Sequence, residues 1–140
     1  GMTHTTLSYE ELQQEIDKAH PHIKNKQGKW IPCKGYSQGY YKVVSAAGMN
    51  SCVYDMSQFL IAQLGFKPQI VSQEVLALLH QPFIRAADFL VKYPYAERFQ
   101  NTSYGVGWRI LSYEGYTIPF HGGFMKGLTH VMALVPDKQI

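Results

Sequence analysis

Apolar positions in the first part of the chain recur at the three- and four-residue spacing of a helix. Four of them share one face of residues 7–20: Leu7, Leu12, Ile16 and Ala19. Ser8, with Glu11 three residues later, forms a capping box, in which each side chain bonds to a free backbone amide at the helix start. The pattern therefore predicts a first helix over residues 7–20.

Two further helices are predicted in the middle of the chain. The first covers residues 51–64, where Ser51 is placed to cap the N-terminus and Gly65 to end the helix. Its apolar face carries Met56, Phe59, Leu60 and Leu64. The second covers residues 72–83 and is limited by Pro82, which cannot continue a helix.

The period of the pattern changes beyond Tyr93. Short segments rich in β-branched and aromatic residues are separated by Glu114-Gly115 and by a glycine-bearing stretch over residues 122–127. They predict antiparallel strands over residues 104–111, 116–120 and 129–135. Helices followed by strands, without alternation of the two, predict an α+β fold in which helices flank an antiparallel sheet.

The length of 140 residues is that of one domain, so the chain is predicted to form a single unit. A helix and a long loop occupy residues 1–45, helices occupy residues 46–92 and antiparallel strands occupy residues 93–140. Within the first part, glycines and prolines interrupt the periodicity of residues 21–41, which indicates a surface loop with one short strand. Tyr40 to Val44 is also strand-like.

Composition excludes several classes of protein. Apolar residues make up 46% of the chain and charged residues 16%, which is typical of a globular protein and not of a disordered one. The net charge of +3 is spread without a basic run, so neither nucleic acid nor another charged partner is expected. The longest uncharged apolar stretch, residues 59–66, is too short to span a membrane. The polar N-terminal residues do not resemble a signal peptide.

Cysteine and histidine positions indicate neither a metal site nor a cofactor. Cys33 and Cys52 lack the spacing of a zinc site, and two free thiols fit the sequence as well as one disulfide. His20-Pro21-His22 has no clustered carboxylate beside it, so its imidazoles are expected to be solvated.

Two short motifs carry candidate chemistry. Gly35-x-Ser37-x-Gly39 matches the nucleophile elbow of α/β-hydrolases, but no strongly apolar strand precedes it, so Ser37 is interpreted as an incidental loop serine. His121-Gly122-Gly123 places a proton-carrying side chain beside backbone that glycine leaves open. A glycine-rich hairpin turn with an incidental histidine explains this second motif equally well.

A set of motifs in a fixed order along residues 45–140 decides between these interpretations. They are Ala47 to Met56 with its Asp55-Met56 pair, Gly105-x-Gly107-Trp108, His121-Gly122-Gly123, and a last strand followed by Pro136-Asp137-Lys138. Together they resemble the serine β-lactamase and penicillin-binding-protein-like superfamily, in its class C β-lactamase and esterase branch. Gly1-Met2-x-x-Thr5 is similar to the family's Leu-Gly-Met-x-x-Thr segment.

The resemblance implies a fragment of a β-lactamase/transpeptidase-like fold. The family's chemistry uses Ser-x-x-Lys, whose serine is acylated, and a Tyr-x-Asn or Ser-x-Asn element. None of the eight serines of this chain has lysine three residues later, and no tyrosine or serine has asparagine two residues later. Because the family places both elements before its Leu-Gly-Met segment, the chain resembles an internal or C-terminal slice that lacks the nucleophile.

Four consecutive residues take site roles through this resemblance. His121, Gly122 and Gly123 correspond to the family's Lys-Thr-Gly or His-x-Gly triplet, so the imidazole is expected to meet a substrate anion and the glycines a substrate backbone. Phe124 is expected to supply a backbone N–H to the oxyanion hole. Histidine lacks the permanent charge of lysine, which weakens the expected recognition of a penicillin carboxylate. Esters and D-amino-acid peptides remain as alternative substrates.

Two main hypotheses follow for the function. In the first, the parent protein is a periplasmic or secreted serine hydrolase that forms an acyl-enzyme with a β-lactam, an ester or a D-Ala peptide, and this chain alone is inactive. In the second, the chain is a non-catalytic scaffold or binding module of the same fold. A small α/β-hydrolase built on Ser37 is a third alternative. The expected partners are a small-molecule or peptide substrate and a second copy of the chain, through a homodimer or strand swap at an unpaired sheet edge.

Overall fold

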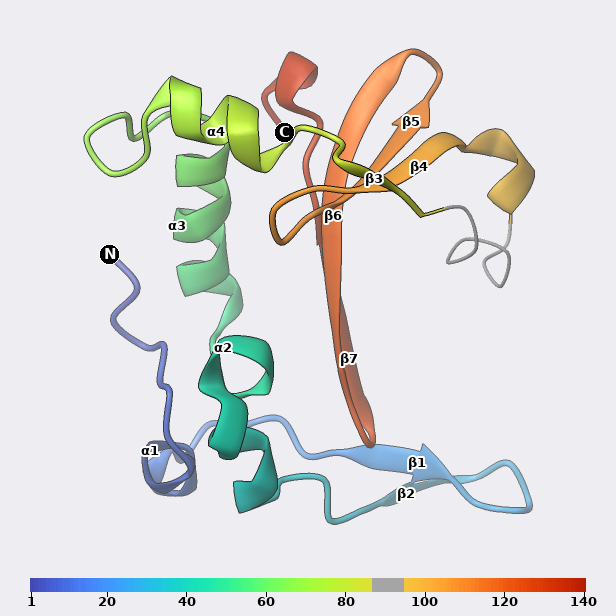
Figure 1. Cartoon of the computed structure of the whole chain (residues 1–140). Coiled ribbons are helices and arrows are strands. Elements are labelled where there is room, and N and C mark those ends of the chain that lie inside the picture. Colours follow the sequence, from blue (N-terminus) through green and yellow to red (C-terminus); the bar gives the residue numbers. More distant parts are fainter. Residues whose placement is uncertain (87–94) are drawn as a thin grey trace. The chain divides into compact units, whose positions relative to one another are not determined.

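A computed structural model describes residues 1–86 and 95–140 of the chain (Figure 1). Its helices are α1 (Tyr9–Gln14), α2 (Val44–Ala47), α3 (Val53–Gln63) and α4 (Gln73–Leu79), with 3₁₀-helices η1 (Gln38–Val43), η2 (Ala96–Arg98) and η3 (Pro136–Lys138). Its strands are β1 (His22–Lys24), β2 (Trp30–Pro32), β3 (Ile84–Arg85), β4 (Gln100–Tyr104), β5 (Arg109–Tyr113), β6 (Tyr116–Met125) and β7 (Leu128–Ala133). The predicted α+β class is confirmed. Within the described ranges, no helix is long and apolar enough to cross a membrane.

The strands form two sheets. β1 and β2 make a two-stranded antiparallel hairpin, and the other five strands lie in the order β3-β4-β5-β6-β7. β3 to β6 pair antiparallel with their neighbours in this order, and β6 returns to β7 through a tight turn at Lys126 and Gly127. Gly127 has φ +85°, a left-handed conformation that glycine adopts without strain. β3 and β7 are therefore the two edges of the larger sheet.

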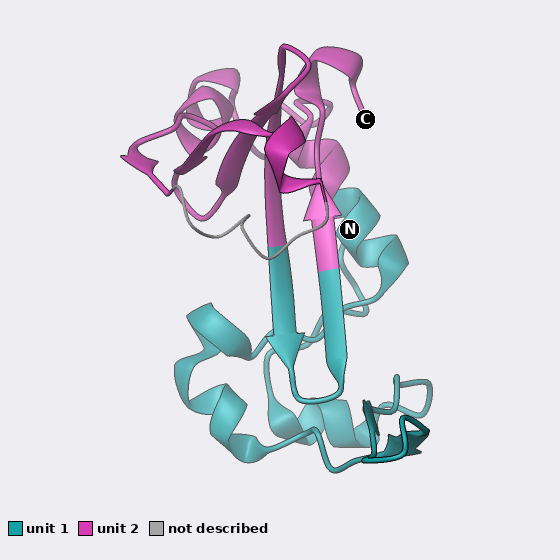
Figure 2. Cartoon of the chain, turned by 90° about the vertical axis from the view of Figure 1, so that its right-hand side faces the viewer, with its two compact units in different colours: residues 1–58, 122–130 teal, residues 59–121, 131–140 magenta. Residues whose placement is uncertain are grey.

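The chain divides into two compact units (Figure 2). Unit 1 consists of residues 1–58 and 122–130, and unit 2 of residues 59–121 and 131–140. The prediction of a single folding unit stays a prediction.

The core of unit 2 forms where the sheet meets α3 and α4. Trp108, Ile110 and Leu134 are buried at its centre. Partly buried side chains pack around them: Phe59, Leu60, Leu64, Leu79 and Met132. The Phe59 and Trp108 rings stack at 6.2 Å between centroids. The helical apolar pattern of the sequence thus corresponds to helices that cover the sheet.

Unit 1 is held together by a buried carboxylate at the start of α3. Asp55 is fully buried, and its Oδ2 accepts hydrogen bonds from the His4 backbone N–H and the Thr5 hydroxyl, both at 2.8 Å. An antiparallel bridge between Thr6 and Asn50 continues this contact. The Gly-Met-x-x-Thr segment and the Asp-Met pair, fifty residues apart in the sequence, therefore lie against each other.

The first predicted helix is shorter than expected. α1 begins after Ser8, whose hydroxyl caps the helix as predicted by accepting from the Glu11 N–H. The Glu11 carboxylate accepts from the Ser8 hydroxyl and from the Leu7 N–H, one residue before the N–H that a capping box would use. It ends at Gln14, where the Lys18 ammonium donates to the Leu12 and Gln13 carbonyls of its last turn. Ile16, which the periodicity placed on the apolar face, is 97% exposed.

The predicted strand over residues 104–111 is wrong, because a turn divides it. The Gly105 N–H donates to the Trp108 carbonyl at 2.7 Å, and Gly107 has φ +76°. This turn separates β4 from β5, and it brings Trp108 into the core. Residues 40–44, which the sequence predicted to be strand-like, belong to η1 and α2. The predicted long loop contains two short strands, the β1–β2 hairpin, where the sequence predicted one.

Candidate functional site

The four predicted site residues are consecutive on β6. This strand runs from Tyr116 to Met125 without interruption at Gly122 and Gly123. The chain reverses only at Lys126 and Gly127. The alternative interpretation of residues 121–123 as a hairpin turn is therefore wrong, because these residues are extended backbone within a sheet.

His121 is half-buried and faces a phenol. Its Nε2 lies 3.3 Å from the hydroxyl oxygen of Tyr104 at the end of β4, and the two rings are nearly perpendicular. The Arg109 guanidinium lies 5.9 Å from the centre of the same tyrosine ring. A hydroxyl both donates and accepts, so Tyr104 orients the imidazole in either protonation state. This geometry leaves the ring able to donate to an anion.

The edge of β6 that carries Gly122 and Phe124 is defined by the strand register. The Pro119 carbonyl accepts from the Leu134 N–H at 2.8 Å, on the β7 side. Successive residues of a strand direct their N–H and C=O groups to opposite edges, so Gly122 and Phe124 direct theirs away from β7. On that side β5 pairs with β6 only as far as Phe120. Among the described residues no strand pairs with this edge beyond Phe120, and the Phe124 side chain is 84% exposed.

Gly123 lies beneath an imidazole that the sequence reasoning did not single out. A Cβ at position 123 would overlap the ring of His130, and one at position 122 would lie 3.2 Å from the His130 carbonyl oxygen. The Thr129 hydroxyl donates to the Gly123 carbonyl at 3.2 Å. Because the turn between β6 and β7 has two residues, His130 stands opposite Gly123. The position of that turn was the signal that could have predicted this contact.

The other sequence motifs do not join this strand. The Ser37 hydroxyl caps η1 by accepting from the Gly39 N–H at 3.1 Å, and a 3₁₀-helix follows it in place of the helix of a nucleophile elbow. His22 Nδ1 lies 2.7 Å from the His20 carbonyl oxygen. Cys33 and Cys52 are free thiols. In the part of the chain that the structure describes, no three His, Cys, Asp or Glu side chains are grouped to hold a metal ion.

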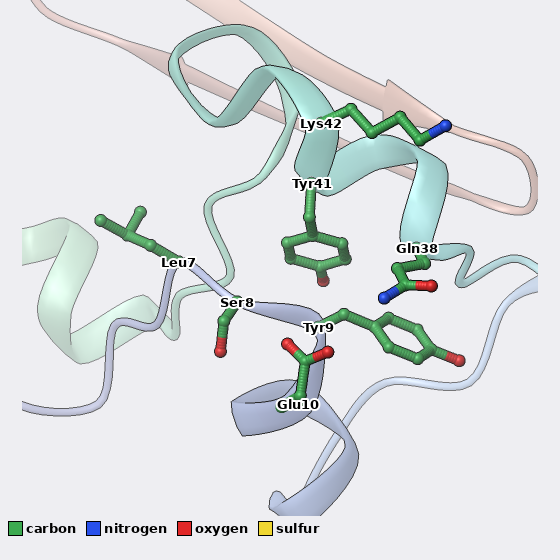
Figure 3. Close-up of a pocket in the computed structure, with 7 residues that line it drawn as sticks. All are labelled: Leu7, Ser8, Tyr9, Glu10, Gln38, Tyr41 and Lys42. Carbon is green, nitrogen blue, oxygen red and sulfur yellow. The ribbon is translucent and has the colours of Figure 1, made fainter.

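Unit 1 also contains an open pocket of about 440 Å³ (Figure 3). It is lined by Leu7, Ser8, Tyr9, Glu10, Gln38, Tyr41 and Lys42. The Tyr9 and Tyr41 rings meet edge to face at 5.7 Å, and the Tyr41 hydroxyl donates to Asn50 Oδ1 at 2.9 Å. Burial, and then the neighbouring Tyr41, raise the pKa of Tyr36, whose hydroxyl donates to the Ala19 carbonyl. The predicted site residues are not part of this pocket.

These features define a class of protein: an α+β fold in which helices pack on an antiparallel sheet and one edge of a His-Gly-Gly strand is unpaired among the described residues. The chain belongs to the Beta-lactamase family, whose sequence model matches residues 1–140.

The fold is similar to that of the octameric penicillin-binding protein homologue from Pyrococcus abyssi. The two structures superpose with a TM-score of 0.75 at 22% sequence identity, over 99% of this chain and 28% of that chain. The chain thus spans 28% of the length of that protein. A comparison with curated proteins found no match.

Proposed function

We propose that this chain is part of a serine hydrolase that forms an acyl-enzyme with a β-lactam, an ester or a D-Ala peptide. The observation that carries the proposal is the edge of β6 beyond Phe120, with which no strand of residues 1–86 and 95–140 pairs and to which Gly122 and Phe124 direct their backbone groups. An extended substrate adds to such an edge through main-chain hydrogen bonds. Membership of the Beta-lactamase family over the whole chain supports this assignment.

Each residue of the strand has a separate role in the proposed reaction. His121, oriented by Tyr104, donates to an anionic or polar group of the substrate. The Phe124 N–H stabilises the oxyanion that forms when a serine hydroxyl attacks the substrate carbonyl, and the nucleophile's own N–H is the second donor. A lysine three residues after that serine takes its proton and passes it to the leaving amine or alcohol as the substrate's C–N or C–O bond breaks, and water then hydrolyses the acyl-enzyme ester. The serine and lysine belong to a Ser-x-x-Lys element elsewhere in a longer, periplasmic or secreted protein.

The 140-residue chain by itself is expected to be inactive, because one oxyanion donor without a nucleophile gives little catalysis. Incubation with a chromogenic cephalosporin and with p-nitrophenyl acetate tests this expectation. Saturable hydrolysis that is lost when one serine is replaced, Ser37 included, would contradict it.

Labelling experiments on the longer protein distinguish a hydrolase from a non-catalytic module of the same fold. The hydrolase is expected to form a covalent adduct with a labelled penicillin or an activated ester, and Ser→Ala in its Ser-x-x-Lys to abolish the adduct. His121→Lys restores a permanent charge and is expected to lower KM for a penicillin about tenfold, with little change for a neutral ester. His20→Lys, in an exposed loop, is the control. Failure to form any adduct would favour the binding module.

The outer edge of β7 supports a second proposal, self-association of the chain. The similar Pyrococcus abyssi protein is described as octameric. In this chain β7 is an edge strand, and Val131 on it is 72% exposed. Unpaired edges with apolar side chains recruit further strands, from a second copy or from a longer chain.

A further inference from the structure

Positive charge is concentrated in the β1–β2 hairpin and the residues that follow it. Residues 22–34, which we call the basic hairpin, contain four lysines and no acidic residue: Lys24, Lys26, Lys29 and Lys34. More widely, residues 18–54 contain six lysines and no aspartate or glutamate. The net charge of +3 for the whole chain therefore conceals a larger positive charge in this part of the chain.

The basic hairpin has a well-defined turn and an anchored base. Asn25 Oδ1 accepts from the backbone N–H groups of Gln27 and Lys29, both at 3.0 Å, and Gly28 adopts a φ of +78°. At the base, the His22 N–H donates to the Gly127 carbonyl at 3.0 Å, within unit 1. The connection between β1 and β2 extends beyond both strands (Figure 1), and Lys26 and Lys29 on it are exposed.

An exposed tryptophan lies among these charges. Trp30 is 61% exposed and stands directly opposite Lys24, whose ammonium lies 5.3 Å from the ring centre. His22 and Pro32 share this face and are also exposed. On the opposite face of the hairpin, Ile31 is 36% exposed. The face that carries Trp30 thus combines a large apolar side chain with an ammonium group, and residues 22–34 contain no carboxylate.

We propose that the basic hairpin binds the surface of a bilayer that contains anionic lipids. Indole rings are favoured at the boundary between headgroups and acyl chains, while lysines extend to the charged headgroups. Nucleic acid fits this surface less well, because unit 1 has no arginine for bidentate phosphate or base contacts. In addition, the ammonium of Lys24 covers one face of Trp30, which a stacked base would need.

The experiment uses the two tryptophans of the chain as reporters. Trp30 is exposed and Trp108 is 4% exposed, so a change in emission on adding vesicles reports the hairpin. We expect a blue shift and quenching by brominated lipid with vesicles of phosphatidylcholine that contain about one third phosphatidylglycerol. Vesicles of pure phosphatidylcholine should give neither change. Trp30→Phe should keep vesicle co-sedimentation and lose the blue shift.

Charge variants test whether the binding is local to the hairpin. Lys26→Gln/Lys29→Gln is expected to weaken co-sedimentation with anionic vesicles by about fivefold for each lysine removed. Lys42→Gln/Lys138→Gln removes the same charge outside the hairpin and should change it less than twofold. Equal binding to neutral and anionic vesicles, or equal loss in both double variants, would overturn the proposal. Tighter binding of a single-stranded oligonucleotide than of anionic vesicles, measured by the change in Trp30 emission, would also overturn the proposal.

Discussion

The imidazole of His130 occupies the space in which any other residue at position 123 would carry its Cβ. The sequence analysis explained Gly122 and Gly123 by the approach of a substrate backbone. For Gly123 the structure supplies a different reason, which is contact with a side chain across the hairpin. The open edge of the strand, where a substrate would add, is a separate feature that depends on backbone direction and not on the missing side chain.

A double-mutant cycle tests this contact. Gly123→Ala is expected to lower the free energy of unfolding by about 1 kcal/mol, because the His130 ring must move out of the way. In a His130→Ala background the same change should be neutral or stabilising, because alanine orders a strand better than glycine does. Urea denaturation of the four proteins measures the coupling. Equal effects of Gly123→Ala in both backgrounds would show that His130 does not restrict this position.

His80 is a second residue whose surroundings come from the fold. It follows α4, and its Nε2 lies 3.3 Å from Gln63 Oε1. Its ring is nearly perpendicular to the Trp108 indole, with 5.6 Å between the ring centroids. Burial lowers the pKa of His80 below its usual 6.5. The neutral ring is therefore the form that the folded protein prefers.

This lowered pKa predicts a pH dependence of stability. Between the folded pKa and 6.5 the unfolded chain binds more protons at His80 than the folded chain does. The contribution of His80 to the free energy of unfolding is thus fully present above pH 6.5 and is lost as the pH falls through the folded pKa. As the pH is lowered from about 8 to about 5, the urea midpoint of unfolding should fall more steeply for wild type than for His80→Gln, because glutamine does not titrate. Parallel profiles for the two proteins would contradict the assignment, and His20→Gln is the exposed control.

At the scale of elements, local interactions predicted where the helices lie, whereas the limits of the strands depended on pairing with other strands. Ser8 and Ser72 located the starts of α1 and α4, and the apolar spacing located α3, because these interactions lie within a few residues of one another. α1 and α4 end earlier than the apolar spacing predicted. The division of residues 104–111 into β4, a turn and β5 depended on pairing with β6, which local propensity does not contain. The extension of β6 through Gly122 and Gly123 has the same cause, because β7 supplies the pairing that stabilises glycine in a strand.

At the scale of the whole molecule, β7 predicts association between copies, because it is an edge strand of the sheet in the described part of the chain. Static light scattering at rising protein concentration is expected to show masses above that of one chain. Val131→Lys, which places a charge on the edge, should weaken association by about tenfold. Val75→Lys on α4 is the control, since Val75 is 47% exposed but is not on a strand. A monomer that persists at millimolar concentration would contradict the prediction.

The sequence by itself determined the α+β class, the presence of three helices, the N-terminal caps of two of them (Ser8 and Ser72), and the family. These depend on local spacing and on motifs whose order is visible in one dimension. It also contained the acid-free run of residues 18–54, although the overall charge concealed it. Only the tertiary structure showed that Asp55 holds His4 and Thr5, that His130 covers Gly123 and that Tyr104 orients His121. Each of these contacts joins residues brought together by strand register or by chain reversal, and their partners are therefore fixed by the fold and not by distance along the chain.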